Sequence, residues 1–205
     1  ASGLKQNDIV LTNAFTLAPV PGAIQGAGGC PVFVEITKDL VLDLDDLKAK
    51  IESTNAKFLM LSHMRGHIVD MEALLKITDE AGIKVIEDCA HTMGANWNGI
   101  TSGRSGIVGC YSTQTFKHIN SGEGGFLITD DVEIMAKATM LSGSYMLYES
   151  HLAGAPIEAF ENIRLDTPNC SGRMDNLRAA ILRPQLENLS IQAKRWNKRY
   201  RKLEN

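Results

Sequence analysis

The chain has 205 residues, of which 44% are hydrophobic and 22% are charged, proportions that are ordinary for a globular protein and exclude wholesale disorder. Its 21 basic and 24 acidic side chains give a net charge of −3, which argues against a nucleic-acid binder and against a protein that binds anionic membranes. Its apolar runs are shorter than the roughly 18 residues needed to span a bilayer.

Short apolar runs alternate with helical patterns along the chain. In chain order, the runs predict strands over residues 9–11, 31–36, 57–61, 83–88, 107–111 and 125–129. Helices are predicted over residues 44–51, 70–81 and 131–141, with Asp43 as a cap of the first and Gly82 as the end of the second. Apolar strands that alternate with helices predict an α/β fold, in which helices flank a largely parallel sheet.

The last third of the chain is less regular. Residues 143–172 are rich in Gly, Ser and Pro and are expected to form a long loop, in which Tyr145, Tyr148 and His151 have no predicted role beyond contact with substrate or an interface. A long helix is predicted from Met174 onward, and Pro184 should kink or restart it.

The four cysteines are widely and irregularly spaced and form no C-x-x-C pair. This spacing favours neither a zinc site nor a redox dithiol. The sequence also lacks G-x-x-x-x-G-K-[ST], H-E-x-x-H and G-x-S-x-G, the motifs of phosphate-binding loops, zinc proteases and serine hydrolases. We therefore predict no metal site, free thiols in a reducing compartment, and a cytoplasmic location.

Two segments at predicted strand ends carry residues suited to catalysis, because ligands of open α/β sheets bind beyond the carboxyl ends of the strands. The first runs from an apolar strand into Asp88 and, three positions later, His91. The second contains Ser112 and neighbouring hydroxyl residues, then Lys117, and then a Gly-rich turn into the next strand.

A strand-end aspartate and a loop lysine beside hydroxyl groups suit pyridoxal phosphate. This cofactor needs a lysine amine for a Schiff base, a carboxylate that faces its pyridine nitrogen, and donors for its phosphate. Lys117, Asp88 and Ser112 supply these groups. On spacing alone, an exposed lysine and a capping aspartate are the commoner explanation.

Residues 83–129 resemble the DegT/DnrJ/EryC1/StrS family of sugar aminotransferases, which belong to fold type I of the pyridoxal phosphate enzymes. The matching motifs are residues 87–95 (E-D-C-A-H-T-M-G-A), residues 103–106 (G-R-S-G), Tyr111-Ser112, Lys117, and residues 122–125 (G-E-G-G). Residues 31–36, 66–71 and 173–186 are similar to further family segments, so the resemblance extends over nearly the whole chain.

The resemblance implies roles for five residues. Lys117 would form the Schiff base and then shuttle a proton, while Asp88 would pair with the pyridinium nitrogen. His91 would lie near the ring oxygen of the cofactor and Ser112 near its phosphate, whereas Arg173 would reach the phosphate across a dimer interface. The alternatives are a buried structural role for His91 and a plain interface ion pair for Arg173.

The resemblance also exposes one departure near the start of the chain. Relatives carry Thr followed by an aromatic residue that stacks on the pyridine ring, and the matching pair here is Thr16-Leu17. Either Leu17 gives aliphatic packing against the ring, or Phe15 takes its place.

The implied protein is a cytoplasmic, homodimeric aminotransferase that moves an amino group from glutamate or glutamine to a keto-sugar, often nucleotide-linked. Relatives with histidine in place of the lysine are sugar dehydratases, so Lys117 favours transamination. We predict that residues 1–172 form the cofactor-binding large domain, without its N-terminal segment, and that residues 173–205 form a helix that leads to a small domain outside this chain. A pyridoxal phosphate enzyme of another reaction type, a non-catalytic regulatory protein that binds the cofactor, and a truncated module are the alternatives.

Overall fold

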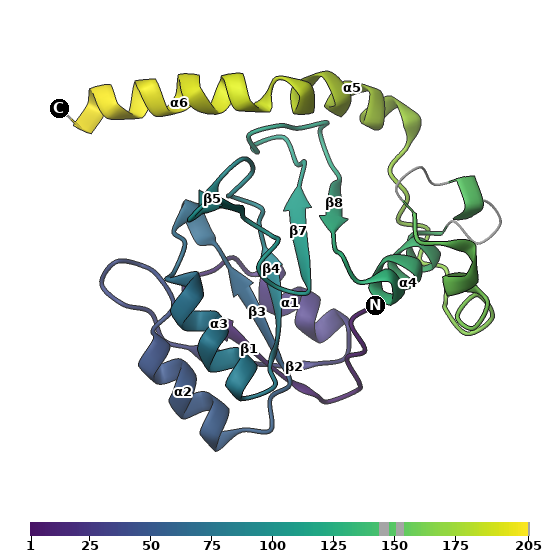
Figure 1. Cartoon of the computed structure of the whole chain (residues 1–205), viewed down its shortest axis with the longest axis horizontal. Helices are drawn as coiled ribbons and strands as arrows, with labels where there is room; N and C mark the ends of the chain where they lie inside the picture. Colours follow the sequence, from purple (N-terminus) through teal and green to yellow (C-terminus); the bar gives the residue numbers. More distant parts are fainter. Residues whose placement is uncertain (144–147, 151–153, 205) are drawn as a thin grey trace.

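A six-stranded sheet forms the centre of the computed structural model, which describes residues 1–143, 148–150 and 154–204 (Figure 1). The strand order is β2-β1-β3-β4-β7-β8; the first five strands are parallel, and β8 is antiparallel to β7. The strands are β1 (Ile9–Asn13), β2 (Cys30–Val34), β3 (Phe58–Ser62), β4 (Lys84–Asp88), β7 (Val108–Ser112) and β8 (Gly125–Ile128). The largely parallel sheet confirms the predicted α/β fold.

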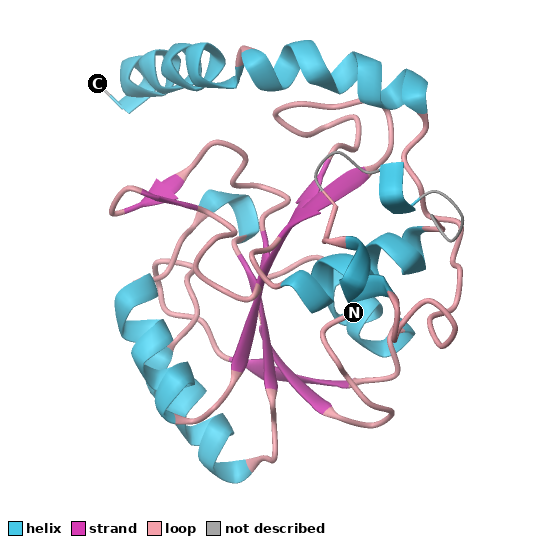
Figure 2. Cartoon of the chain, turned by 45° about the vertical axis from the view of Figure 1, so that its right-hand side comes forward, coloured by secondary structure: helices cyan, strands magenta, loops and turns pink. Residues whose placement is uncertain are grey.

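Helices cover both faces of this sheet (Figure 2). On one face, α2 (Leu44–Ser53) and α3 (Met71–Glu80) bury the largest apolar cluster against the central strands. On the other face, α1 (Pro19–Gly26) contributes Ile24 to a smaller apolar cluster with strands β1 and β3. The helix α4 (Val132–Ser142) follows β8 and packs against the irregular segment that comes after it.

The three helices predicted before residue 143 are confirmed to within two residues at each end. Each begins after an aspartate whose carboxylate accepts hydrogen bonds from backbone N–H groups that the first helical turn leaves without partners. These aspartates are Asp43, Asp70 and Asp131.

The helix α1 and a short hairpin were not predicted. The helix α1 has the sequence P-V-P-G-A-I-Q-G, which reads as a loop, but both prolines lie in the first turn, where no intrahelical N–H donor is needed. The hairpin of β5 (Asn96–Trp97) and β6 (Ile100–Thr101) turns at Asn98-Gly99, both with positive φ. Asn-Gly between apolar residues is the strongest short-range hairpin signal, so the sequence contained the evidence for this element.

The C-terminal helix does not restart at Pro184, so that part of the prediction is wrong, while a kink at Pro184 stays a prediction. Pro184 lies inside α5 (Asn176–Glu187), and the break comes four residues later, at Asn188, before α6 (Leu189–Glu204). Proline has no N–H, so Pro184 leaves the carbonyl of Ala180 without its helical hydrogen-bond donor. Ala180 is exposed, and water can donate to this carbonyl instead. Asn188 ends the helix with its side-chain amide donating to the Pro184 carbonyl over 2.8 Å.

The helix α5 lies across the carboxyl end of β7 (Figures 1 and 2). Leu182 and Leu189 pack in a cluster with Tyr111, and the Gln185 side chain hydrogen-bonds the backbone of Asn120 in both directions. The predicted division of the chain after residue 172 stays a prediction.

The predicted loop of residues 143–172 contains two short 3₁₀ helices, η2 (Tyr148–Ser150) and η3 (Ile157–Phe160). Tyr148 is buried and stacks on Phe160 with ring centroids 4.4 Å apart, so it is a packing residue. Tyr145 and His151 lie outside the described residues. Among the helices that are described, none combines the length and apolar character needed to cross a membrane.

Candidate active site

The pairing of three parallel strands gathers polar side chains at one edge of the sheet. Ser62 ends β3 and is the register partner of Asp88, which ends β4, while Cys110 of β7 is the register partner of Asp88 on its other side. Because side chains alternate between the two faces of a strand, Ser112 lies on the same face as Cys110. Ser62, Asp88 and Ser112 therefore share one face at the carboxyl end of the sheet.

The carboxylate of Asp88 is held from two sides. One of its oxygens, Oδ2, accepts a hydrogen bond from Ser62 Oγ at 2.8 Å, and Oδ1 accepts one from the Ala90 backbone N–H at 3.1 Å. An ionised carboxylate has about four acceptor positions, so these two bonds leave each oxygen with capacity for another donor. This half-buried group is suited to binding a protonated ring nitrogen.

Ser62 is fixed in turn by residues of the first strand and the loop after it. The Asn13 side chain accepts from the Ser62 N–H at 2.8 Å and donates to the Ser62 carbonyl at 3.0 Å. The Thr16 hydroxyl lies 2.8 Å from Ser62 Oγ. Because the single hydroxyl hydrogen of Ser62 goes to Asp88, Thr16 is the donor of this second bond. Thr16, a predicted cofactor residue, thus contacts Asp88 through Ser62.

Lys117 lies on the connection between β7 and β8. Backbone hydrogen bonds between Thr113 and Gly124 and between Thr115 and Gly122 extend the ladder of these strands into the connection. The Lys117 N–H donates to the Gln114 carbonyl at 2.9 Å and closes a turn. These hydrogen bonds tie the backbone around Lys117 to the ends of β7 and β8.

His91 contacts Lys117 and lies close enough to Asp88 to feel its charge. The Lys117 amine lies 2.9 Å from His91 Nε2, and the backbone N–H of Arg65, in the 3₁₀ turn η1 (Met64–Gly66), donates to His91 Nδ1 at 3.3 Å. Burial lowers the pKa of His91, and the positive charge of Lys117 lowers it further, while the negative charge of Asp88 opposes this effect. His91 is therefore a neutral imidazole at neutral pH.

Ser112 lies at the end of β7, and its hydroxyl oxygen accepts from the Gln114 N–H at 3.3 Å. This contact does not use the hydroxyl hydrogen, which suits a donor to phosphate. Near the start of the chain, Leu17 has 45% of its surface exposed, whereas Phe15 is half-buried. The question of which of them packs on a ring stays open.

Among the described contacts, none joins Arg173 to the other predicted site residues. Its guanidinium donates to the Gly143 carbonyl at 2.6 Å, and the residue lines a cavity of about 680 Å³ between β7, β8 and α4. The predicted role of Arg173 involves a second subunit, so a single chain leaves that role a prediction.

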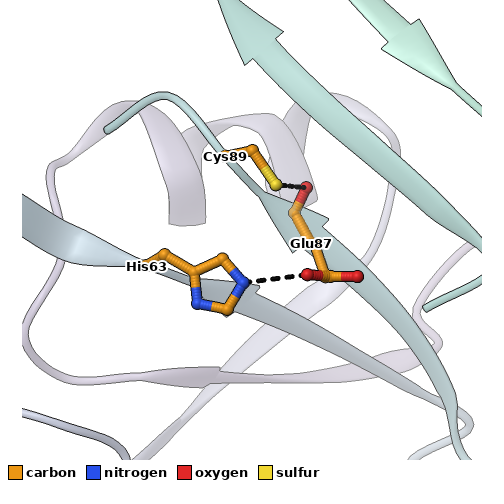
Figure 3. A group of neighbouring side chains, drawn as sticks. All are labelled: His63, Glu87 and Cys89. Carbon is orange, nitrogen blue, oxygen red and sulfur yellow. Dashed lines mark hydrogen bonds and ion pairs between the residues drawn. The ribbon is translucent and has the colours of Figure 1, made fainter. Parts of the chain in front are cut away.

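A buried charged cluster lies on the opposite face of β4 (Figure 3). Glu87 accepts hydrogen bonds from His63 Nε2 at 2.9 Å and from the N–H groups of Gly103, Ser105 and Gly106 at 2.7–2.9 Å. Burial alone would raise the pKa of Glu87, but the bonds from His63, Gly106 and Gly103 outweigh it and leave this pKa below its usual value.

With Cys89, this cluster brings three potential metal-ligand atoms within 4.8 Å of one another. Four N–H donors already occupy the Glu87 carboxylate, however, and burial raises the pKa of the Cys89 thiol to about 12, so the thiolate needed for metal binding is disfavoured. The contacts describe a structural cluster that fixes the turn at residues 103–106. Sequence analysis did not assign a role to His63 or Glu87.

All 205 residues match the family model of the DegT/DnrJ/EryC1/StrS aminotransferases. The chain belongs to this family. It is 32% identical to a pleiotropic regulatory protein of Geobacillus stearothermophilus (98% of this chain, 50% of the relative) and 33% identical to the GDP-perosamine synthase of Vibrio cholerae (95% and 51%). The chain spans about half the length of these curated relatives.

One of the similar solved structures contains pyridoxal phosphate. The E. coli GDP-4-keto-6-deoxy-D-mannose-3-dehydratase with bound hydrated pyridoxal phosphate superposes with a TM-score of 0.75 at 25% identity, over 96% of this chain and 53% of that one. The DegT/DnrJ/EryC1/StrS aminotransferases depend on pyridoxal phosphate.

The residues at the edge of this sheet fit that cofactor. Asp88 retains acceptor capacity on both oxygens, the half-buried Lys117 offers a primary amine, and Ser112 has an uncommitted hydroxyl hydrogen in its described contacts. When bound, pyridoxal phosphate supplies an aldehyde that condenses with an amine and a ring that accepts electrons.

Ser62 and Asn13 were missed at the sequence level, although each is the polar residue with which a strand ends. We expect Ser62→Ala to weaken binding of pyridoxal phosphate roughly tenfold, because it removes a hydrogen bond to a charged carboxylate. Fluorescence titration of the protein with the cofactor measures this affinity. Ser53→Ala, at the end of α2, is a matched control that should leave the affinity unchanged. Equal affinities for both variants would show that Ser62 does not orient Asp88.

Proposed function

We propose that the protein is a pyridoxal phosphate-dependent aminotransferase that moves an amino group from glutamate or glutamine to a keto-sugar through a Schiff base on Lys117. The observation that carries the proposal is the arrangement of Lys117, His91 and Asp88 at the carboxyl end of the parallel sheet. Lys117 Nζ lies 2.9 Å from His91 Nε2, and His91 is close enough to Asp88 for that carboxylate to affect its pKa.

Each residue has a distinct task in this proposal. Asp88 would accept a hydrogen bond from the protonated ring nitrogen. Its negative charge would keep the proton on that nitrogen, and the protonated ring is a better electron acceptor. The Lys117 amine would remove the proton from the α-carbon of the amino donor and return it two atoms away, a 1,3-shift that is the general acid–base part of transamination. Ser112 binds the phosphate, Thr16 supports Asp88 through Ser62, and Leu17 or Phe15 packs on the ring.

The substrate proposal draws on the names of relatives. Besides the GDP-perosamine synthase, a dTDP-3-amino-3,4,6-trideoxy-alpha-D-glucose transaminase of Micromonospora megalomicea is 31% identical over 91% of this chain and 47% of that protein. These names support a nucleotide-linked keto-sugar as the amino acceptor. We also propose a homodimer in the cytoplasm, in which Arg173 of one subunit reaches the phosphate held by the other.

Two alternatives have specific support. A relative at 32% identity is named a pleiotropic regulatory protein, which favours a regulatory role with the cofactor bound. The neighbouring dehydratase structure favours a second pyridoxal phosphate reaction on a sugar. Lys117 weighs against dehydration, because a lysine amine can both hold the cofactor covalently and move the proton.

The visible spectrum of the purified protein with pyridoxal phosphate tests the proposal. We expect a Schiff-base band that glutamate or glutamine converts to the aminated cofactor, with release of the matching keto acid. A nucleotide-linked keto-sugar should then restore the band and give an amino sugar. A band that neither amino acid changes would favour the regulatory role, and release of a deoxygenated sugar would favour dehydration.

A further inference from the structure

The connection between β7 and β8 that carries Lys117 is supported differently at its base and at its tip. At its base, backbone hydrogen bonds join residues 113–115 to residues 121–124. At its tip, Phe116, the residue before Lys117, has 89% of its surface exposed. The strands therefore support the two ends of the connection, and the packing of its tip comes from the residues after the lysine.

The two residues that follow Lys117 pack against α5 and α6, beneath which the tip of the connection lies in Figure 1. The ring of His118 lies 5.2 Å from that of Trp196 in α6. Ile119 is buried in an apolar cluster that contains Leu182 of α5. These contacts press the tip against the helices, but ring and aliphatic contacts are not directional and leave it free to slide along them.

The third residue after Lys117 is bound to α5 by directional contacts. The Gln185 side-chain oxygen accepts a hydrogen bond from the Asn120 N–H at 3.0 Å, and its NH₂ group donates to the Asn120 carbonyl at 2.8 Å. The same NH₂ group donates to the Ile181 carbonyl at 2.9 Å, which fixes the Gln185 side chain on its own helix. One amide thus binds both polar groups of the Asn120 backbone and sets where the tip lies along α5.

The position of this backbone affects the Lys117 amine. The half-buried Lys117 lies between the ladder at the base and the bound Asn120, and its Nζ is 2.9 Å from His91 Nε2. A tip that slides along α5 would carry Nζ away from His91 and from the edge of the sheet where Asp88 lies. A displacement of about 1 Å of a reacting group can lower a rate about 10²-fold, so the place of this backbone matters to chemistry at the amine.

We propose that Gln185 is a positioning residue that acts through the backbone of Asn120 and holds the Lys117 amine at the carboxyl edge of the sheet. This inference rests on the proposed function, because a fixed amine matters only if Lys117 reacts with an aldehyde. In that reaction the amine adds to the aldehyde carbon and water leaves.

The first test uses the nitrogen-15 NMR signals of the histidine rings in the cofactor-free protein, because the Nε2 signal of His91 reports its contact with the Lys117 amine. Lys117→Ala defines the signal without this contact. Gln185→Met is similar in size but has no amide, and it should move the His91 signal at least halfway toward its place in Lys117→Ala. The ring of His63, which Glu87 binds on the other face of β4, should keep its signals.

The control for this test is Gln192→Met, the same change at a half-buried glutamine of α6. Within the part of the chain that the structure describes, the Gln192 side chain makes no hydrogen bond, so this variant should leave the His91 signal unchanged. A native His91 signal in Gln185→Met would overturn the proposal. Equal shifts of the His91 and His63 signals would also overturn it, because they would show a general change of fold.

The second test mixes cofactor-free protein with pyridoxal phosphate and follows the Schiff-base band at several cofactor concentrations. The concentration dependence of the rate separates binding of the cofactor from the covalent step. Gln185→Met should slow the covalent step roughly tenfold and leave the binding constant within about twofold of the native value. An unchanged covalent step, or an equal loss in both quantities, would contradict the proposal. A native protein without the band would instead refute the Schiff base on Lys117, and the NMR test would still decide whether Gln185 positions the amine.

Discussion

Replacing Lys117 with alanine is expected to abolish the covalent link to pyridoxal phosphate and to lower transamination by at least about 10³-fold, because the change removes both the amine that condenses with the aldehyde and the group that moves the proton. Borohydride reduction of the protein with its cofactor, followed by peptide mass spectrometry, measures the link directly. In the native protein the pyridoxyl group should be found on the peptide that contains Lys117.

Two further variants make this result specific. Lys117→Arg keeps a positive charge on the same loop but cannot form a stable imine, so it should lose the covalent link as alanine does. Lys84→Ala changes an exposed lysine at the start of β4, at the opposite end of the strand from Asp88, and should retain both the link and the activity. A Schiff-base band that persists in Lys117→Ala would refute the role of this lysine.

The elements that sequence reasoning predicted correctly have strong local signals. The helices that begin after Asp43, Asp70 and Asp131 each combine an apolar face with a capping carboxylate, and both features act within one or two turns. The helix α1 lacks a capping carboxylate and has two prolines and two glycines in eight residues; it buries Val20 and Ile24, and Ile24 packs in a cluster with strands β1 and β3. Tertiary packing of that kind cannot be read from a local pattern.

The same distinction divides the residues of the candidate site. Asp88, His91, Ser112 and Lys117 stand in motifs whose chemistry is visible in sequence, and their proposed roles remain predictions. The residues that orient them come from elsewhere in the chain: Ser62 reaches Asp88 through the register of β3 with β4, and Arg65 reaches His91 over 26 positions. Strand register and turn geometry create these contacts, so a linear motif did not reveal them.

The buried pair of Glu87 and His63 is expected to control stability more than any other polar group described above. Glu87→Gln should lower the free energy of unfolding by about 3 kcal/mol or more, because it leaves buried N–H donors without a hydrogen-bond acceptor. One carboxylate oxygen of Glu87 accepts hydrogen bonds from His63 and Gly103, and the other accepts them from Ser105 and Gly106. A glutamine amide has one oxygen and one NH₂ group. In either orientation, its NH₂ group therefore faces one of these pairs of N–H donors and cannot accept from them. Urea unfolding at pH 7 measures the difference.

The pH dependence of this difference follows from the pKa of Glu87, which is lower in the folded protein than its usual value of 4.5. A carboxyl with a depressed folded pKa contributes stability that is fully present above the unfolded pKa and is lost as the pH falls through the folded pKa. The native protein should therefore lose its advantage over Glu87→Gln progressively below about pH 4.5. Glu52→Gln, an exposed change on α2, should behave like the native protein at every pH. A stability difference between native and Glu87→Gln that stays constant down to pH 3 would mean that the ionised carboxylate is not what holds the turn at residues 103–106 against β4.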